Sequence, residues 1–365
     1  MPTPPASPVA RVGAVDFARG ALMLAIVAGH ALTNLAPEHH GFALGINYFL
    51  SGTVGFVTVS GLLVGWFTIV KRDRYDRIAA RYRLQAGRLL LIAHPLLALI
   101  LFLPHAPVDT SFLRFATRTL FVTDTLAVLF FVLVPLAIRI PARARLAIGI
   151  AFFLINSIAN LVHPVGRATA LLHDLFDGVD PNHRHVLFSD YGFLPITGMF
   201  LIGSWIGDRL ASAQLAGRER AFLLRLVGIA AGLFVLSAAM IGVWAAVHHG
   251  IHHDVARLLY PDYENTLYPA YLAGTLLLLA IASRLDLSHP VPRAITLIGK
   301  TSLFVYVAQY VLVQLLPYLF GWQGALEPFG WLALTLVASV ALVPLAAQWN
   351  LRVKHAWTTR PRTGG

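Results

Sequence analysis

The chain consists of long apolar segments separated by short polar connections. A helix needs about 20 apolar residues to cross a bilayer core about 30 Å thick, and ten segments reach or approach that length. They are continuous rather than alternating, so they predict helices and not the strands of a membrane barrel. The predicted spans are residues 13–36, 46–70, 88–104, 118–138, 146–163, 192–208, 221–247, 266–283, 298–320 and 329–349. We therefore predict an all-α polytopic membrane protein with about ten transmembrane helices.

The Lys and Arg residues test this count, because cytoplasmic connections carry an excess of them. With the N-terminus inside, 23 of the 28 Lys and Arg residues lie in or beside inside connections. The residues on the outside are Arg114, Arg118, Arg167, Arg184 and Arg257. We therefore expect both termini in the cytoplasm and a multi-pass protein of a bacterial-type cytoplasmic (inner) membrane.

Composition supports a membrane protein and excludes several other classes. Hydrophobic residues make up 57% of the chain and charged residues 12%, about half the usual share of charge. Because there is no cysteine, disulfides, thiolate metal sites and a cysteine nucleophile are excluded. The net charge of +11 follows the membrane topology instead of one polar face, so we expect the lipid bilayer as a partner and no nucleic acid. The expected organisation is a tail at 1–12, one transmembrane domain at 13–350 and a tail at 351–365.

The first apolar segment carries polar residues, which are costly inside a membrane and commonly functional. Arg19 and His30 are 11 residues apart, so they share one helix face and lie about 16 Å apart along the axis. Asp16 is three residues before Arg19 and can pair with it. An arginine fork suits phosphate, and a neutral imidazole suits general-base work on a hydroxyl. The spacing alone is equally compatible with an interfacial arginine and a histidine bonded between helices.

A wider motif around these residues resembles the opening of the acyltransferase type 3 family. It reads Arg11-x4-Asp16-x2-Arg19-Gly20-x9-His30. Members of that family are integral membrane proteins with an arginine, ten residues and a histidine in the first helix. The compact form of this chain is similar to the branch that succinylates osmoregulated periplasmic glucans.

Three further motifs are similar to the same family. They are Phe56 to Gly61, which resembles a Phe-rich stretch ending in Ser-Gly; Arg81, Arg83 and Arg88 ahead of His94-Pro95; and Gly299-Lys300-x-Ser302-Leu303-x2-Tyr306. Many relatives have His where this chain has Gln309, so we do not count that position as catalytic. The resemblance covers the whole chain but is dense only in the first hundred residues and at 299–309.

The resemblance implies an O-acyltransferase that uses acetyl-CoA or succinyl-CoA as co-substrate, with a carbohydrate acceptor and no bound cofactor or metal. His30 would accept the proton of a sugar hydroxyl that attacks the thioester, or would be acylated transiently. Arg19 would orient the donor, and Asp16 would fix Arg19. The expected donor-binding residues are Arg81, Arg83, Arg88 and Lys300, whose alternative role is to set topology. The expected oxyanion or acceptor residues are Ser60, Ser302 and Tyr306, whose alternative role is helix packing.

Other polar positions carry weaker signals. The histidine-rich stretch 248–254 is expected to be a solvated loop and not a metal site, because adjacent loop histidines lack defined geometry. The preceding outer loop at 183–190 is a candidate contact for the acceptor. Asp124 is expected to cap the fourth span, and His94 either lines the donor site or is hydrogen-bonded at a kink.

Two other function classes remain open. A transporter or flippase for a sugar or lipid-linked substrate would typically show repeated halves with carboxylates at the membrane midplane, and we find no such repeat. A membrane sensor or assembly factor without chemistry would have no need of both Arg19 and His30.

Overall fold

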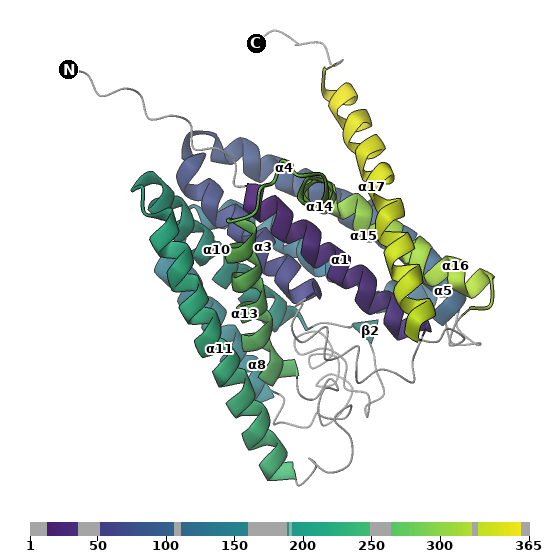
Figure 1. Cartoon of the computed structure of the whole chain (residues 1–365), viewed down its shortest axis with the longest axis horizontal. Coiled ribbons are helices and arrows are strands. Elements are labelled where there is room, and N and C mark those ends of the chain that lie inside the picture. Colours follow the sequence, from purple (N-terminus) through teal and green to yellow (C-terminus); the bar gives the residue numbers. More distant parts are fainter. Residues whose placement is uncertain are drawn as a thin grey trace.

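The computed structural model describes residues 13–35, 52–105, 111–159, 188–189, 192–248, 264–322 and 328–358 of the 365-residue chain. In these residues the fold is a helix bundle, as predicted (Figure 1). Two strands of two residues each pair in parallel, β1 (Thr119–Leu120) with β2 (Phe188–Ser189). The helices are α1 (Gly13–Leu35), α3 (Gly52–Val70), η2 (Arg72–Arg74), α4 (Tyr75–Arg88), η3 (Leu89–Ala93), α5 (His94–His105), α6 (Phe112–Arg118), α7 (Val122–Ala137), α8 (Ala142–Ala159), α10 (Phe193–Leu215), α11 (Glu219–His248), α13 (Glu264–Ala282), α14 (Pro290–Lys300), α15 (Ser302–Tyr310), η5 (Val311–Leu315), α16 (Leu316–Leu319) and α17 (Pro328–Thr358).

Each of the ten predicted spans contains a helix, and six stretches of the described chain are long and apolar enough to cross a membrane. These six are Gly13–Leu32, Gly52–Val70, Arg72–Pro104, Glu219–Gly242, Ser302–Leu319 and Gly330–Arg352. Two shorter apolar helices cover Val122–Ala137 and Leu267–Ala282. The chain is therefore a multi-pass membrane protein by its helices, while the count of ten spans stays a prediction.

Several predicted boundaries are wrong, and two of them bear on the site. The third helix does not begin at 88, because α4, η3 and α5 run on continuously from Tyr75. The ninth does not begin at 298, because the backbone at Thr301 leaves the helical region (φ −112°, ψ 19°) and separates α14 from α15. Prolines in the first turn favour the start of α14 as a helix of its own.

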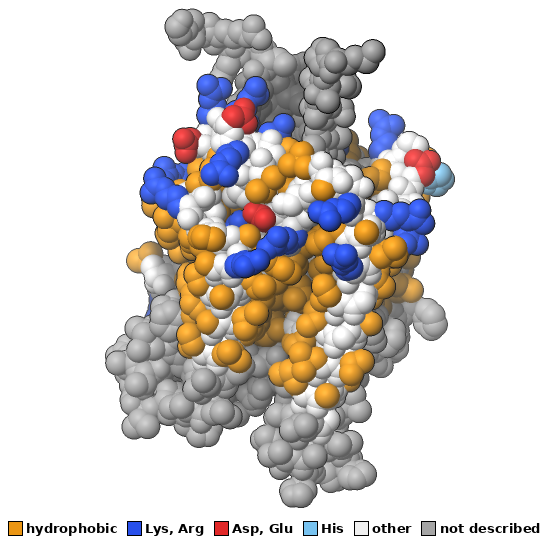
Figure 2. All heavy atoms as spheres, turned by 90° about the vertical axis from the view of Figure 1, so that its left-hand side faces the viewer, with side chains coloured by type: hydrophobic (Ala, Val, Ile, Leu, Met, Phe, Trp, Pro, Cys, Tyr) orange, Lys and Arg blue, Asp and Glu red, His pale blue; other side chains and the backbone are white. Residues whose placement is uncertain are grey.

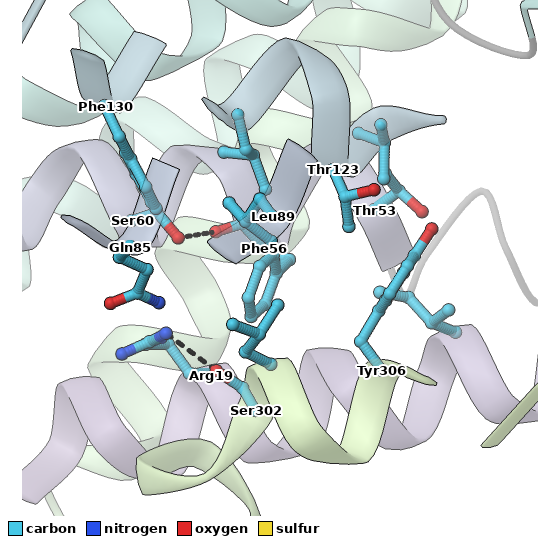
Figure 3. A pocket seen from close by; sticks show the side chains of 14 residues that line it. Arg19, Thr53, Phe56, Ser60, Gln85, Leu89, Thr123, Phe130, Ser302 and Tyr306 are labelled. Atoms are coloured by element: carbon cyan, nitrogen blue, oxygen red, sulfur yellow. Dashed lines mark hydrogen bonds between the residues drawn. The ribbon is translucent and has the colours of Figure 1, made fainter. Parts of the chain in front are cut away.

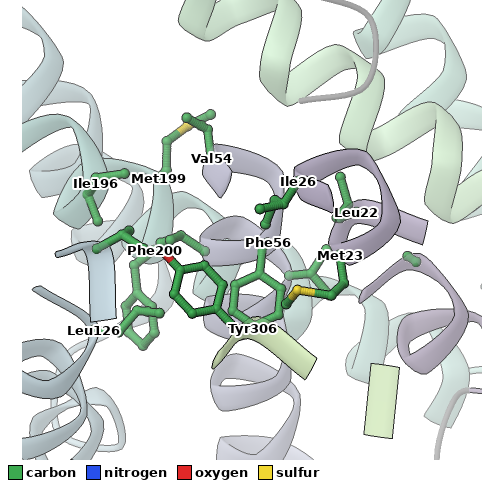
Figure 4. Packing of buried hydrophobic residues seen from close by; sticks show 14 of the residues in the cluster. Leu22, Met23, Ile26, Val54, Phe56, Leu126, Ile196, Met199, Phe200 and Tyr306 are labelled. Carbon is green, nitrogen blue, oxygen red and sulfur yellow. The ribbon is translucent and has the colours of Figure 1, made fainter. Parts of the chain in front are cut away.

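The bundle has a buried centre and an apolar outer surface. In the most apolar stretch of α3, 83% of the residues are buried inside the bundle. In the most apolar stretch of α11, only 17% are buried. Figure 4 shows the apolar core where α1, α3, α7, α10 and α15 meet. On the outside, Figure 2 shows hydrophobic side chains over the middle of the molecule and Lys and Arg side chains gathered toward one end. An exposed apolar surface of this extent on several helices fits contact with lipid.

Glycines bring α3 and α10 into direct backbone contact. A Cβ atom on Gly61 or Gly65 would overlap the carbonyl oxygens of α10, and one on Gly203 or Gly207 would overlap those of α3. Both pairs have the small-xxx-small spacing that lets membrane helices approach closely. This contact fixes the position of Phe56 and Ser60, which project from α3 into the site described below.

Arg145 is one of the inside residues that the sequence assigned to topology, and the structure gives it another role. Its side chain is 2% exposed, and its Nη2 atom donates to Oδ2 of Asp208 at 2.9 Å. A second guanidinium nitrogen donates to the hydroxyl of Ser204. Arg145 therefore ties α8 to α10, which together with α3 form one side of the bundle.

Candidate active site

A pocket lies inside the bundle where α1, α3, α4, α7 and α15 meet (Figure 3). It contains about 440 Å³ of space not filled by atoms, part of which is open to solvent. One end of the pocket is polar and is formed by Arg19, Ser60, Gln85 and Ser302. The other end carries three hydroxyl groups, from Thr53, Thr123 and Tyr306. The side chains between the two ends are apolar and include Ile26, Phe56, Leu89 and Leu126.

The two polar ends are about 10 Å apart, because seven residues separate Thr53 from Ser60 on α3. We call this elongated pocket, with hydrogen-bonding groups at each end, the passage.

Arg19 is fixed by α15 and by α3. Its Nη2 atom donates to the hydroxyl oxygen of Ser302 at 2.7 Å, and its guanidinium carbon lies 5.4 Å from the centre of the Phe56 ring. Two motif glycines explain the close approach: a Cβ on Gly20 would overlap the backbone of α14, and one on Gly299 would overlap that of α1. The site therefore depends on a crossing of α1 and α14 that leaves no room for side chains.

His30 contacts the same neighbouring helix two turns further on. Its Nδ1 atom lies 3.1 Å from Oε1 and 2.9 Å from Nε2 of Gln309. Its ring lies 4.7 Å from the ring of Tyr310, whose hydroxyl is 3.1 Å from that of Tyr306. Since Tyr306 lines the pocket, two tyrosines connect the pocket to the catalytic candidate. The prediction that Arg19 and His30 share one face of the first helix agrees with these contacts.

The other predicted site residues fall into two groups. Ser302 and Tyr306 line the pocket with Arg19, and so does Ser60, but the Ser60 hydroxyl donates to the carbonyl of Phe56 at 2.9 Å. As an oxyanion donor, Ser60 would first have to break that bond. Asp16 is buried at the crossing of α1 and α14, with 1% of its side chain exposed.

The predicted donor contacts lie outside the pocket. The side chains of Arg81, Arg83, Arg88 and Lys300 are all exposed. At 100° per residue, Arg81 and Arg88 lie within about 60° of Gln85, whereas Arg83 lies about 160° from it. Gln85 lines the pocket, so Arg81 and Arg88 are on the side of α4 that leads to it.

Sequence reasoning missed four polar residues of the site. Gln85, Thr53 and Thr123 line the pocket, and Gln309 contacts His30. Nothing distinguishes the two threonines in the sequence, because single threonines are common near the ends of membrane helices. A signal for Gln309 was present: it is seven residues after Ser302, so both lie on one face of the ninth predicted helix.

A second histidine is held close to the pocket. His94 has Nδ1 2.8 Å from Oδ2 of Asp124 and Nε2 3.0 Å from the carbonyl oxygen of Ala116. Asp124 also accepts from the backbone N–H of Phe121, so the prediction that it caps this helix is confirmed. His94 does not line the pocket, and its contacts favour the second of the two alternatives, a histidine that is hydrogen-bonded between helices. The stretches 183–190 and 248–254 were expected to hold acceptor contacts and a solvated loop. Except for residues 188, 189 and 248, they lie outside the described residues.

The arrangement combines groups that can bind a polar or anionic ligand with a group that can accept a proton. A cation and hydroxyls at one end of the passage can bind an anionic or amide-bearing donor. An imidazole on the same helix, further along the bundle, can accept a proton from a hydroxyl.

Comparison with known proteins gives one match that covers almost the whole chain. A family described as an acyltransferase domain matches residues 12–347, a range that includes every residue of the pocket as well as His30 and Gln309. A search of curated proteins found no match.

Proposed function

Because the chain belongs to the acyltransferase type 3 family, we propose that it transfers an acetyl or succinyl group from acyl-CoA to a hydroxyl of a glycan or other cell-envelope carbohydrate. The observation that carries this proposal is the placement of Arg19 and His30 on one helix, both held by α15, beside a passage with polar ends. Nothing in the structure favours a transporter or flippase over this reaction.

The passage suits the flexible arm of coenzyme A, in which amide groups alternate with apolar segments. Arg19 and Gln85 offer hydrogen-bond donors at one end, and Thr53 and Thr123 offer hydroxyls at the other. The anionic phosphates would lie toward the basic end of the molecule, where Arg81 and Arg88 flank Gln85. Lys300 is exposed in the last turn of α14 and is proposed as a further contact for acyl-CoA. Arg83 lies on the side of α4 opposite to Gln85 and is therefore the weakest candidate for donor binding.

The proposed reaction begins with attack of an acceptor hydroxyl on the thioester carbonyl. His30 accepts the hydroxyl proton, the new C–O bond forms, the C–S bond breaks, and the thiolate of coenzyme A takes up the proton. Ser302 and Tyr306 are the candidates to donate hydrogen bonds to the oxyanion. Asp16 would position Arg19 from within the same helix.

We further propose ten spans with both termini in the cytoplasm of a bacterial-type cell, so that donor and acceptor reach the site from opposite sides. Helix directions support this count. Contacts of Arg19 with Ser302 and of His30 with Gln309 mean that α1 and α15 run in the same direction, as the first and ninth of alternating spans should. The glycine contacts make α3 and α10 run parallel, as the second and sixth should.

The test is acyl transfer in proteoliposomes. Labelled acetyl-CoA and succinyl-CoA are supplied on the proposed cytoplasmic face, and envelope glycans, including periplasmic glucans, are offered as acceptors. The wild type should label a glycan, and His30→Ala should lose about 10²–10⁴-fold in rate, the usual contribution of a positioned general base. Equal activity in His30→Ala, at equal yield and membrane insertion, would remove His30 from the mechanism.

A further inference from the structure

One hydroxyl group of the pocket is buried without a hydrogen bond. The side chain of Thr123 is 2% exposed, and its Oγ1 atom has no hydrogen-bond partner among the described residues. Figure 3 shows this oxygen directed toward the end of the pocket where Thr53 and Tyr306 lie. A buried hydroxyl that stays unpaired costs free energy, so this position favours a bound group that accepts a hydrogen bond.

The start of α7 explains why the Thr123 hydroxyl is unpaired. Several threonines inside helices donate to the carbonyl oxygen four residues before them, as Thr58, Thr275 and Thr296 do at 2.9, 2.8 and 2.7 Å. Thr123 is the second residue of α7, and the residue four before it, Thr119, belongs to β1. The helix therefore provides no such carbonyl for Thr123, and its hydroxyl can donate to a ligand.

The surroundings of Thr123 favour a hydrogen bond to a developing negative charge. Val122 and Thr123 lie in the first turn of α7 and line the pocket, so the partially positive end of that helix lies beside it. Asp124 follows in the same turn, but it does not line the pocket, and its carboxylate is bonded to His94. The middle of the passage is apolar, and hydrogen bonds are stronger where water is excluded.

Thr123 lies at the end of the passage that leads to His30. Tyr306 is at this end, and its hydroxyl lies 3.1 Å from that of Tyr310, whose ring contacts His30. Arg19 is at the opposite end. In the proposed function the phosphates of coenzyme A bind toward the Arg19 end, so the thioester lies at the Thr123 end.

We propose that Thr123 donates a hydrogen bond to the carbonyl oxygen of the donor thioester and stabilises the negative charge that forms there. This inference rests on the proposed function. When the acceptor oxygen bonds to the carbonyl carbon, an electron pair of the C=O bond moves to the carbonyl oxygen, which accepts from Thr123. The C=O bond forms again as the C–S bond breaks. Thr123 keeps its proton, and the acceptor proton passes through His30 to the thiolate.

Binding of two kinds of donor analogue tests this hydrogen bond without an acceptor. Ketone analogues of acetyl-CoA and succinyl-CoA have a methylene group in place of the sulfur and keep the carbonyl oxygen. The matched thioethers, S-ethyl-CoA and S-(3-carboxypropyl)-CoA, lack that oxygen. Thr123→Val should weaken binding of the ketone by about fivefold or more and leave binding of the thioether unchanged.

Thr197→Val is the matched control. Thr197 on α10 is also 2% exposed with an unpaired hydroxyl, but it does not line the pocket. This variant should bind both kinds of analogue as the wild type does. Both Val variants should melt at or above the wild-type temperature in detergent, because a methyl group replaces an unpaired buried hydroxyl.

The proteoliposome assay measures the effect on the reaction. Thr123→Val should lower kcat by about 10²-fold, the usual result of removing one donor to an oxyanion. Thr123→Ser, which keeps the hydroxyl, should recover most of that rate.

Three results would overturn the inference. If Thr123→Val weakens binding of ketone and thioether equally, or of neither, the hydroxyl does not contact the carbonyl oxygen. A lower melting temperature for Thr123→Val than for the wild type would mean that the hydroxyl already has a partner in the protein. If the wild type binds no analogue, the proposed function fails and the inference fails with it, whereas discrimination lost in Thr123→Val alone supports both.

Discussion

The side chains that carry the proposed chemistry are each held by α15. Ser302 accepts from Arg19, Gln309 contacts His30, and Tyr306 joins the pocket to Tyr310 beside the histidine. The hydrogen bond from Arg19 to Ser302 is charge-assisted and therefore stronger than a bond between neutral groups. It holds the planar guanidinium in one orientation and so fixes the directions of its other N–H groups. The arginine fork, and not only its charge, should therefore matter for donor binding.

Arg19→Lys tests this point. Lysine keeps the charge but loses the planar fork, so KM for acyl-CoA should rise by about tenfold, which corresponds to the loss of about 1.4 kcal/mol of binding. The rate at saturating donor should change much less. Arg225→Lys, an exposed substitution on α11, serves as the control and should leave KM unchanged. A wild-type KM in Arg19→Lys would mean that Arg19 acts as a point charge or not on the donor at all.

At the scale of helices, two backbone crossings position the site. Helices α3 and α10 meet backbone to backbone at Gly61, Gly65, Gly203 and Gly207. Helices α1 and α14 meet in the same way at Gly20 and Gly299. In a membrane, where apolar burial gives little preference between lipid and protein, such close packing is a main source of helix association. The pair of the buried Arg145 with the partly buried Asp208 adds a polar link between α8 and α10.

Gly65→Ala should destabilise the bundle. Its new Cβ would meet the backbone carbonyl of Ser204, which cannot rotate away, so we expect a loss of about 1–3 kcal/mol, typical of overpacking. Thermal unfolding in detergent, followed by tryptophan fluorescence, measures the change. Gly232→Ala on α11 is the matched control, because its Cβ would meet no other atom. Equal melting temperatures for the two variants would contradict the close contact of α3 with α10.

At the scale of the whole molecule, the face seen in Figure 2 divides into an apolar middle and a basic end. The first turn of α1 and the last turn of α17 lie toward the same end of the bundle (Figure 1). Ser111 and Ala216 are both exposed, and the proposed topology places them on opposite sides of the membrane. Their accessibility can therefore test the orientation directly.

Because the chain has no cysteine, single introduced cysteines report accessibility without background. In intact cells a membrane-impermeant maleimide should label Ser111→Cys and should leave Ala216→Cys unlabelled until the cells are lysed. The reason is that basic connections, such as the one that contains Ala216, are retained in the cytoplasm. The reverse pattern would invert the proposed orientation, and with it the side from which acyl-CoA reaches the site.

Part of the site could be predicted from the sequence because it depends on one helix. A fixed rise and rotation per residue place Arg19 and His30 on one face wherever that helix packs. The same holds for Ser302 and Tyr306, which are one turn apart. Membrane thickness similarly limits the length of the apolar segments, so the helical class and the positions of the helices follow from hydropathy.

The remaining features depend on which helices become neighbours, and helical periodicity does not contain that information. Gln309 reaches His30 across 279 positions of sequence, and Thr53 and Thr123 enter the pocket from two different helices. Arg145 has the sequence context of a topology signal and is instead buried against α10. The sequence by itself determined the membrane class, the helices and the pair Arg19 and His30, because each is local. Only the tertiary structure decided the partners of that pair and the walls of the passage beside it, because these contacts join helices far apart in the chain.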